Sequence, residues 1–261
     1  MNDKVKELTA KLEKGMQDMF QSDRYKAYLD MQARFYNYSF NNCMLIMLQN
    51  PNASYVAGFS VWKKLGRAVK RGEHGISIIA PCFKKIQNAD GEEEKLTYFR
   101  AAYVFDVEQT EGEELPELVK GELKGEQDCS EMLHKLAEIA PCEITYTNIA
   151  DGAKGRYLTA EKRIEIKQGM SGIQTVKTAI HEIAHSMLHA APCDKDKRTK
   201  EVEAESVAYI VSNYLGIDTS EYSFGYIAGW AGDQEQKKIK DSLATIQKCA
   251  AEIIENYEKI C

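Results

Sequence analysis

The sequence of 261 residues lacks any long apolar run, and no segment approaches the roughly 18 apolar residues of a membrane-spanning helix. Its first seven residues contain no apolar signal core. Seven cysteines, an odd number, are scattered without C-x-x-C spacing, which argues against both a disulfide framework and a cysteine zinc site. We therefore expect a cytoplasmic protein with reduced thiols and no membrane partner.

Positive charge is also scarce, because 34 Lys and Arg residues stand against 40 Asp and Glu residues and leave a net charge of −6. The overall charge therefore gives no argument for nucleic acid. Residues 63–71 depart from this balance, with five basic side chains, no acidic one and aromatic neighbours. This composition is typical of a single-strand nucleic-acid surface, although a bare run of this kind is more often a solvated turn. The candidate DNA-binding residues are Trp62, Lys63, Lys64, Arg67, Lys70 and Arg71.

The clearest motif is H-E-x-x-H, formed by His181, Glu182 and His185 inside an apolar run that favours a helix. Residues four apart share one face of a helix, so the two imidazoles can bind one metal ion with Glu182 beside them. Ser171 is the predicted N-cap of this helix, and Pro192 marks its expected end.

A second predicted helix, from an N-cap at Thr199 to Gly216, carries three glutamates. Glu201 and Glu205 share a face, whereas Glu203 points nearly opposite. A site with two histidines needs one carboxylate, so we predict Glu201 as the third ligand. Glu205 would accept the free ring N–H of a ligand histidine. Alternatively, these glutamates only form a solvent-exposed face of the helix and bind no metal.

Two histidines and one carboxylate are typical of a single Zn²⁺ per chain, with a fourth position left for water. Glu182 is then the predicted catalytic residue that activates this water. His189 lies a further turn along, about 5.4 Å away, which predicts a hydrogen-bonded histidine rather than a ligand. We expect residues 163–167 to form an edge strand that aligns a peptide, and Tyr222 or Tyr226 to stabilise an oxyanion.

The predicted fold class is α+β, with N-terminal helices and a small antiparallel sheet followed by a zincin-like, H-E-x-x-H domain. The boundaries are 1–115 for the first domain, 116–128 for an acidic linker and 129–261 for the second domain. Within the first domain we predict helices at 3–20 and 24–47, strands at 76–81, 83–86 and 96–107, and a hairpin turn at 88–91.

Both halves resemble known proteins. The first half carries Ser39-Phe40-Asn41-Asn42-Cys43-Met44-Leu45-Ile46, Gln49-Asn50-Pro51, Val56-Ala57-Gly58-Phe59 and Val69-Lys70-Arg71-Gly72-Glu73. These segments resemble the N-terminal single-stranded-DNA-binding domain of the ArdC antirestriction family. The H-E-x-x-H motif with Glu201 and Glu205 is similar to the metallopeptidase domain of ArdC-like and LtrC-like proteins, which is related to ImmA and IrrE peptidases. Glu205 stands where related peptidases carry an orienting acid, and it remains an alternative ligand.

Two hypotheses follow from the motifs and the resemblance. The first is a gluzincin-like zinc metallo-endopeptidase with an unknown protein substrate, joined to a single-stranded-DNA-binding domain and encoded by a plasmid, integrative element or phage. The alternative is a non-catalytic antirestriction protein that binds single-stranded DNA and in which zinc is structural. Replacement of Glu182 discriminates between them, because only the first hypothesis requires this residue.

Overall fold

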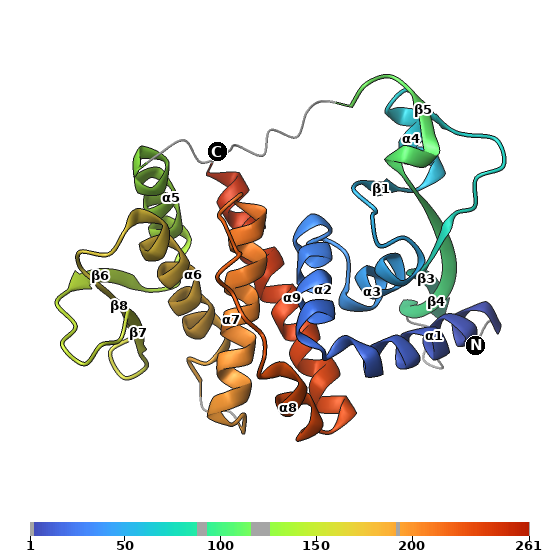
Figure 1. The fold of residues 1–261 in the computed structure, drawn as a ribbon. Coiled ribbons are helices and arrows are strands. Elements are labelled where there is room, and N and C mark those ends of the chain that lie inside the picture. Colours follow the sequence, from blue (N-terminus) through green and yellow to red (C-terminus); the bar gives the residue numbers. More distant parts are fainter. Residues whose placement is uncertain (1–2, 88–92, 116–125, 192–193, 261) are drawn as a thin grey trace. The chain divides into compact units, whose positions relative to one another are not determined.

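The structure is a computed structural model that describes residues 3–87, 93–115, 126–191 and 194–260 (Figure 1). The chain forms two compact units. Unit 1 consists of Met1–Met19 and Phe40–Glu117, and unit 2 consists of Phe20–Ser39 and Leu118–Cys261. The mixture of helices and small sheets confirms the predicted α+β class.

Unit 1 combines short helices with two small antiparallel sheets, one with strand order β1-β4-β3 and one formed by β2 and β5. Its elements are α1 (Asp3–Met19), α3 (Phe40–Gln49), β1 (Val56–Ala57), α4 (Phe59–Lys64), β2 (Arg67–Val69), β3 (Ile76–Gln87), β4 (Glu93–Asp106), η1 (Val107–Gln109) and β5 (Thr110–Gly112). The apolar residues of α1 recur at helical spacing and are buried: Val5, Leu8, Leu12, Met16 and Met19.

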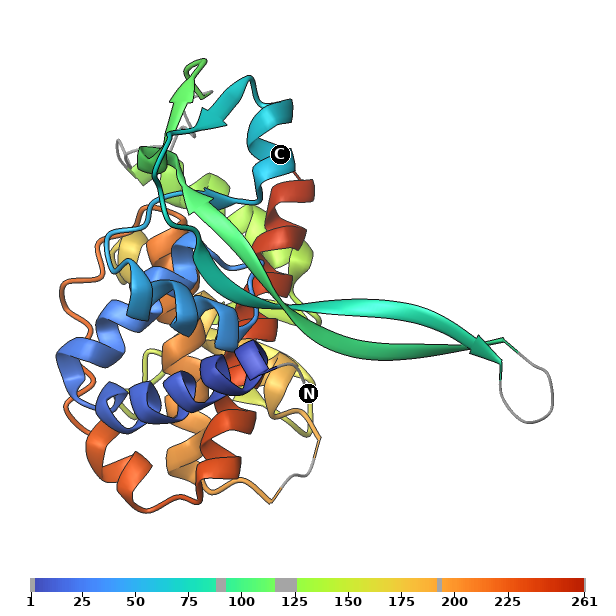
Figure 2. The ribbon, with the colours of Figure 1, turned by 90° about the vertical axis from the view of Figure 1, so that its right-hand side faces the viewer.

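Strands β3 and β4 form a long two-stranded ribbon that extends beyond α1 and α3 of the same unit (Figure 2). Helix α3 fixes the base of the ribbon through side-chain amides. Asn42 exchanges hydrogen bonds of 2.9 and 3.0 Å with the backbone of Ile79, and Gln49 does the same with Ser77. The predicted break between two strands near residue 82 is absent, because β3 pairs with β4 along its whole length. The predicted turn at 88–91 lies outside the described residues.

Unit 2 is a helical assembly beside a three-stranded sheet. Its elements are α2 (Ser22–Arg34), α5 (Glu126–Ile139), β6 (Glu143–Thr147), β7 (Gly155–Leu158), β8 (Arg163–Lys167), α6 (Gly172–Leu188), α7 (Lys197–Tyr214), α8 (Ile227–Gly232) and α9 (Gln236–Lys259). Helix α7 packs against α2, α6, α8 and α9 and is the centre of the unit. Most of the predicted linker lies outside the described residues, and α5 already begins at Glu126.

The helix predicted over residues 24–47 is wrong in one respect, because α2 and α3 are separate helices. The chain turns between them: the N–H of Tyr38 donates to the carbonyl of Phe35, and the Gln32 amide donates to both of their carbonyls. No glycine or proline marks this turn. The helical spacing of apolar residues continues through it, and this is why the sequence predicted a single helix. As a result α2 belongs to unit 2, whereas the predicted division placed it in the first domain.

The sheet of unit 2 also corrects an expectation. Strand β8 was predicted to be a free edge, but it is the central strand, parallel to β6 on one side and antiparallel to β7 on the other. Its backbone groups are therefore already paired with both neighbours. The edge strand that adjoins α6 is β7.

Among the described residues, no helix combines the length and the apolar character needed to cross a lipid bilayer.

Candidate metal centre

Helix α6 carries the H-E-x-x-H motif and begins at the predicted cap. The hydroxyl of Ser171 accepts a hydrogen bond from the N–H of Gln174 at 3.3 Å. The helix ends at Leu188, four residues before Pro192, with His189 as C-cap. Buried apolar residues hold α6 in the core, namely Val176, Ala179, Ile180, Ile183 and Ala184. The histidine face is thereby turned toward a cleft.

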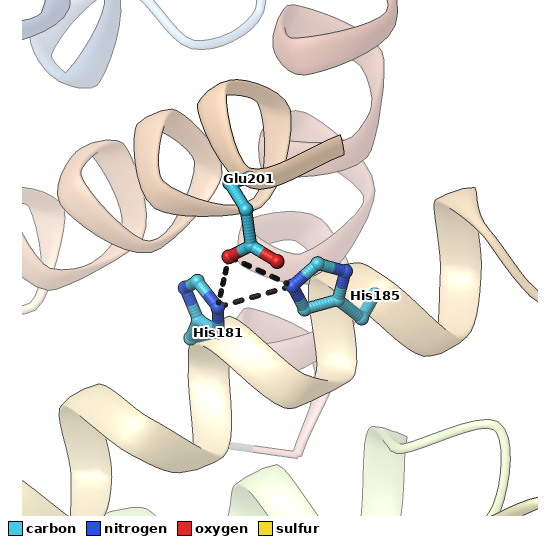
Figure 3. A group of neighbouring side chains, drawn as sticks. All are labelled: His181, His185 and Glu201. Atoms are coloured by element: carbon cyan, nitrogen blue, oxygen red, sulfur yellow. Dashed lines mark hydrogen bonds and ion pairs between the residues drawn. The ribbon is translucent and has the colours of Figure 1, made fainter. Parts of the chain in front are cut away.

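Helix α7 begins at a different residue from the one predicted. Its N-cap is Asp196 rather than Thr199, because the Asp196 carboxylate accepts hydrogen bonds from both the N–H and the hydroxyl of Thr199 at 2.8 and 3.0 Å. Thr199 thus lies inside the first turn and also accepts from the indole N–H of Trp230 at 3.0 Å. The packing of α7 beside α6 brings Glu201 over the two histidines (Figure 3).

His181, His185 and Glu201 converge on one point (Figure 3). The two Nε2 atoms are 3.1 Å apart, and each lies 3.6 Å from Oε2 of Glu201. A tetrahedral Zn²⁺ with bonds of about 2.0–2.1 Å requires donor atoms about 3.3 Å apart. The triangle of donor atoms therefore fits one small divalent cation, held by these three side chains.

The electrostatics of the triangle favour a cation. Burial alone would lower the pKa of His181, but hydrogen bonds to Glu201 and Glu205 outweigh it and raise that pKa to about 10. Conversely, hydrogen bonds from His181 and His185 hold the pKa of Glu201 far below its usual value. The carboxylate is therefore charged, and in the absence of metal it draws positive charge onto the imidazole beside it.

Glu182 is buried next to the triangle, against the edge strand β7. A Cβ atom on Gly155 would lie 3.0 Å from Cγ of Glu182 and 2.6 Å from Cγ2 of Thr178, so only glycine allows this approach. Burial raises the pKa of the Glu182 carboxyl, against the opposing effect of the two histidines and a hydrogen bond from the backbone N–H of Tyr157. The Glu182 carboxyl thus lies beside the proposed cation site, in contact with β7.

The remaining histidine and glutamates form contacts behind the triangle. Oε2 of Glu205 lies 3.2 Å from Nδ1 of His181, where the sequence predicts an orienting acid. His189 lies outside the triangle and contacts His185 between their Nδ1 atoms at 3.0 Å. Glu203, which the sequence interpretation left aside, is fully buried with Oε2 at 3.0 Å from Nε2 of His189. In the sequence, the position of His189 four residues after His185 was the signal that these two rings could be in contact.

The triangle and Glu182 line a divided cleft. One part, of about 620 Å³, is lined by His185, Glu201 and the β7 residues around Tyr157, and the other, of about 370 Å³, by Glu205 and Tyr222. His181, Glu182 and Gly155 line both parts. Tyr226 also lies near enough to the site for the charges of Glu205 and Glu201 to help raise its pKa, in addition to burial. Both tyrosines expected as oxyanion donors therefore remain candidates.

The candidate DNA-binding residues have different environments. Trp62 is fully buried and donates its indole N–H to the carbonyl of Phe105 at 2.9 Å, so it cannot stack on a base. Arg67 is bound to Thr110 and Glu113 across the β2–β5 pair. Lys70 donates to the carbonyl of Glu108 at 2.8 Å. Lys63, Lys64 and Arg71 are exposed, as are Lys70 and the neighbouring Phe59.

Exposed aromatic side chains in unit 1 also occur on the β3–β4 ribbon, which the sequence interpretation treated only as a hairpin. Phe83, Phe99 and Tyr103 are each more than half exposed, and Tyr98 is 47% exposed. Their strand periodicity did not reveal this, because alternation indicates two faces but does not say that the ribbon leaves the core.

Comparison with known proteins gives a family match for the first part of the chain. Residues 2–113 match the family described as the N-terminal domain of anti-restriction factor ArdC. A protein of Bacillus anthracis that is named uncharacterized is 26% identical across 88% of this chain and 47% of its own length, so the chain spans about half of that relative.

Two solved structures extend the comparison through unit 2. The metal-free crystal structure of the antirestriction protein ArdC from plasmid R388 has a TM-score of 0.54 at 20% identity, over 84% of this chain and 85% of that one. The Mn(II)-bound structure of the same protein has a TM-score of 0.53 at 18% identity, over 85% of each chain. Residues 2–113 are therefore similar to the N-terminal domain of ArdC, as the sequence motifs predicted, and the chain shares the fold of the R388 protein.

Proposed function

We propose that this chain is an antirestriction protein that binds single-stranded DNA through unit 1 and holds one divalent metal ion in unit 2. The observation that carries the DNA-binding part is the ribbon, whose exposed surface is both aromatic and basic. The family match of residues 2–113 supports the antirestriction role.

One face of the ribbon suits a single strand especially well. Residues that pair across β3 and β4 share a face, which places Phe83, Phe99, Tyr103 and Lys95 on the same side. Nζ of Lys95 lies 3.9 Å from the centroid of the Phe83 ring, so a cation and a stacking platform occur together. Exposed rings can stack on unpaired bases of any sequence, while cations contact the phosphates.

The test is the affinity of the full chain for a fluorescent single-stranded oligonucleotide. Replacing Phe83, Phe99 and Tyr103 by alanine should weaken binding by at least about tenfold, because each base–aromatic stack contributes about 1–3 kcal/mol. Exposed Tyr146, in unit 2, offers a control whose replacement by alanine should leave binding unchanged. Binding by wild type should also weaken steeply with salt. Equal affinity of the triple variant and wild type would remove the ribbon from the proposal.

The metal part of the proposal is supported by the fit of His181, His185 and Glu201 to a single ion. Manganese is bound in the R388 structure, and zinc suits a site with two imidazoles. Elemental analysis of wild type and of Glu201→Ala tests the site. Metal retained at the wild-type level in Glu201→Ala would exclude this glutamate as a ligand.

A second candidate function, a metal-dependent endopeptidase, is favoured by one specific observation. Glu182 lies against β7, an outer strand of the sheet, where the N–H of Tyr157 donates to its carboxylate. An extended peptide could add to this edge by backbone hydrogen bonds, and Glu182 could take a proton from water and pass it to the leaving amine. The bound metal ion would supply Lewis-acid activation. This assignment replaces the predicted role of β8.

The variant Glu182→Gln separates the two functions. It should abolish any metal-dependent peptide cleavage while leaving protection of DNA and oligonucleotide affinity intact. If Glu182→Gln also abolishes protection in cells, the non-catalytic interpretation is wrong. If no cleavage is found and the variant protects as well as wild type, the peptidase function is excluded.

A further inference from the structure

His185 is the end of a chain of buried polar side chains. Its Nδ1 lies 3.0 Å from Nδ1 of His189, and Nε2 of His189 lies 3.0 Å from Oε2 of Glu203. Lys195 donates to both oxygens of that carboxylate at 2.7 and 2.8 Å. Glu203 is fully buried and the side chain of His189 is 4% exposed, so water has little access to these hydrogen bonds.

We infer that Glu203 and Lys195, acting through His189, fix the ring orientation and tautomer of His185 so that its Nε2 presents a lone pair to the metal ion. The inference rests on the metal site proposed above. It assigns His189, Glu203 and Lys195 as positioning residues, because none of them reaches the triangle of ligand atoms.

The direction of each hydrogen bond follows from the one before it. The Glu203 carboxylate only accepts, so Nε2 of His189 must carry a hydrogen. The other nitrogen of a neutral His189 then has a lone pair and accepts from Nδ1 of His185. A neutral His185 with hydrogen on Nδ1 has its lone pair on Nε2, which is the atom that faces His181 and Glu201.

Lys195 balances the negative charge of Glu203 in this series of hydrogen-bonded side chains. Its ammonium group neutralises Glu203, so the pair directs a hydrogen bond to His189 without leaving a net charge in the core. Glu203 also accepts from Ser242 on α9. Burial would raise the pKa of Glu203, but the hydrogen bonds from His189, Lys195 and Ser242 outweigh this effect and hold the pKa below its usual value. The carboxylate is thus held by residues at the end of α6, in the segment before α7 and on α9.

The other ligand histidine is oriented by different means. Nδ1 of His181 contacts Glu205 directly, and this carboxylate is 35% exposed in the cleft. His185 instead reaches its carboxylate through a second imidazole in the core. The difference gives the inference a specific test, because a change at Glu203 should affect His185 and leave His181 unchanged.

The variant Glu203→Gln keeps the shape of the side chain and reverses the hydrogen bond. Lys195 will hold the amide oxygen, so the NH₂ group will face His189 and donate to Nε2. His189 must then donate from Nδ1, and His185 must place its hydrogen on Nε2, toward the triangle. We expect Zn²⁺ affinity, measured on the full chain with a chelator, to fall by about 10–100-fold.

The tautomer itself can be read from the ¹⁵N shifts of the imidazole rings in the metal-free full chain. The five histidines of the sequence can be assigned by substitution. We expect Glu203→Gln to convert His185 to the form with hydrogen on Nε2, and His181 to keep the wild-type form. Asp30→Asn is a matched control, because this carboxylate in the same unit binds Tyr209 and Asn213, away from the metal ligands.

Each outcome decides the inference. An unchanged His185 tautomer in a folded Glu203→Gln variant overturns it, even if zinc affinity falls, because Glu203 would then act through packing alone. If this variant does not fold, His189→Phe provides the same test, since it removes the acceptor that holds hydrogen on Nδ1 of His185, and His185 should then no longer be confined to that tautomer. If wild type binds no Zn²⁺, the proposed metal site fails, and the tautomer measurement still decides the positioning role.

Discussion

The two candidate sites are built in opposite ways. The metal centre of unit 2 uses side chains whose separation is set by helix geometry, with two ligands four residues apart on α6 and a third on the adjacent α7. The candidate DNA surface of unit 1 uses side chains on a ribbon and a short helix, where exposure depends on which part of each strand leaves the core. Spacing within one helix therefore defines two of the three metal ligands, whereas tertiary packing decides which side chains form the DNA surface.

The largest expected effect comes from removing a ligand of the metal centre. His185→Ala should reduce metal affinity by more than about 100-fold, which exceeds the usual effect of losing an orienting partner. Isothermal titration with Zn²⁺ measures it. Oligonucleotide affinity of the same variant should equal that of wild type. A joint loss of both activities would break the comparison, because it would make the two sites interdependent.

Trp62 and Phe59 sharpen the contrast within unit 1. Trp62→Ala should lower the free energy of unfolding by about 3–5 kcal/mol, because the side chain is fully buried and hydrogen-bonded. Phe59→Ala should leave stability nearly unchanged, since this ring is 62% exposed. Denaturant unfolding compares the two variants. Comparable destabilisation by both variants would show that Trp62 and Phe59 do not differ in burial as described.

Gly155 tests the contact between β7 and Glu182. Gly155→Ala should cost about 1–3 kcal/mol of stability, because the added methyl group overlaps Thr178 and Glu182. Gly58, whose Cβ position has open space, is the matched control. Thermal unfolding of Gly155→Ala and Gly58→Ala provides the measurement. Equal behaviour of the two variants would mean that the strand is not held against the helix.

The smallest effect concerns the start of α7. Asp196→Ala should lower the free energy of unfolding by about 1 kcal/mol, the usual cost of a lost N-cap. Thr199→Ser keeps the hydroxyl that bonds Asp196 and Trp230 and should cost less. Chemical denaturation should rank the variants in this order, and the reverse order would restore Thr199 as the more important start signal.

Sequence reasoning was most accurate where one element decides the outcome. The Ser171 cap and the apolar face of α6 could be derived from local spacing, as could the pairing of two strands around residues 88–91. The central place of β8 could not, because strand order depends on contacts between distant segments. Glu203 escaped notice for a similar reason, since its partners His189 and Lys195 lie on other parts of the fold.

Trp62 shows a second limit. Its basic neighbours and aromatic ring suggested a DNA contact, yet the same amphipathic indole can equally satisfy a backbone carbonyl in the core. Composition does not distinguish these two uses. The exposed aromatic residues of the ribbon were in turn assigned only to a hairpin, because their alternation resembles that of a strand with one buried face.

The position of α2 has a practical consequence for dissecting the protein. Residues 2–113 match one family, but α2 within this range packs in unit 2, where Tyr25 bonds Ser206 at 2.8 Å and Asp30 accepts from Tyr209 at 2.6 Å. A fragment that begins after the family boundary would carry the metal ligands without α2 and would expose the α7 surface that α2 covers. The segment that matches the family and the compact unit that folds together thus have different boundaries. Recombination between relatives at the family boundary would separate α7 from α2.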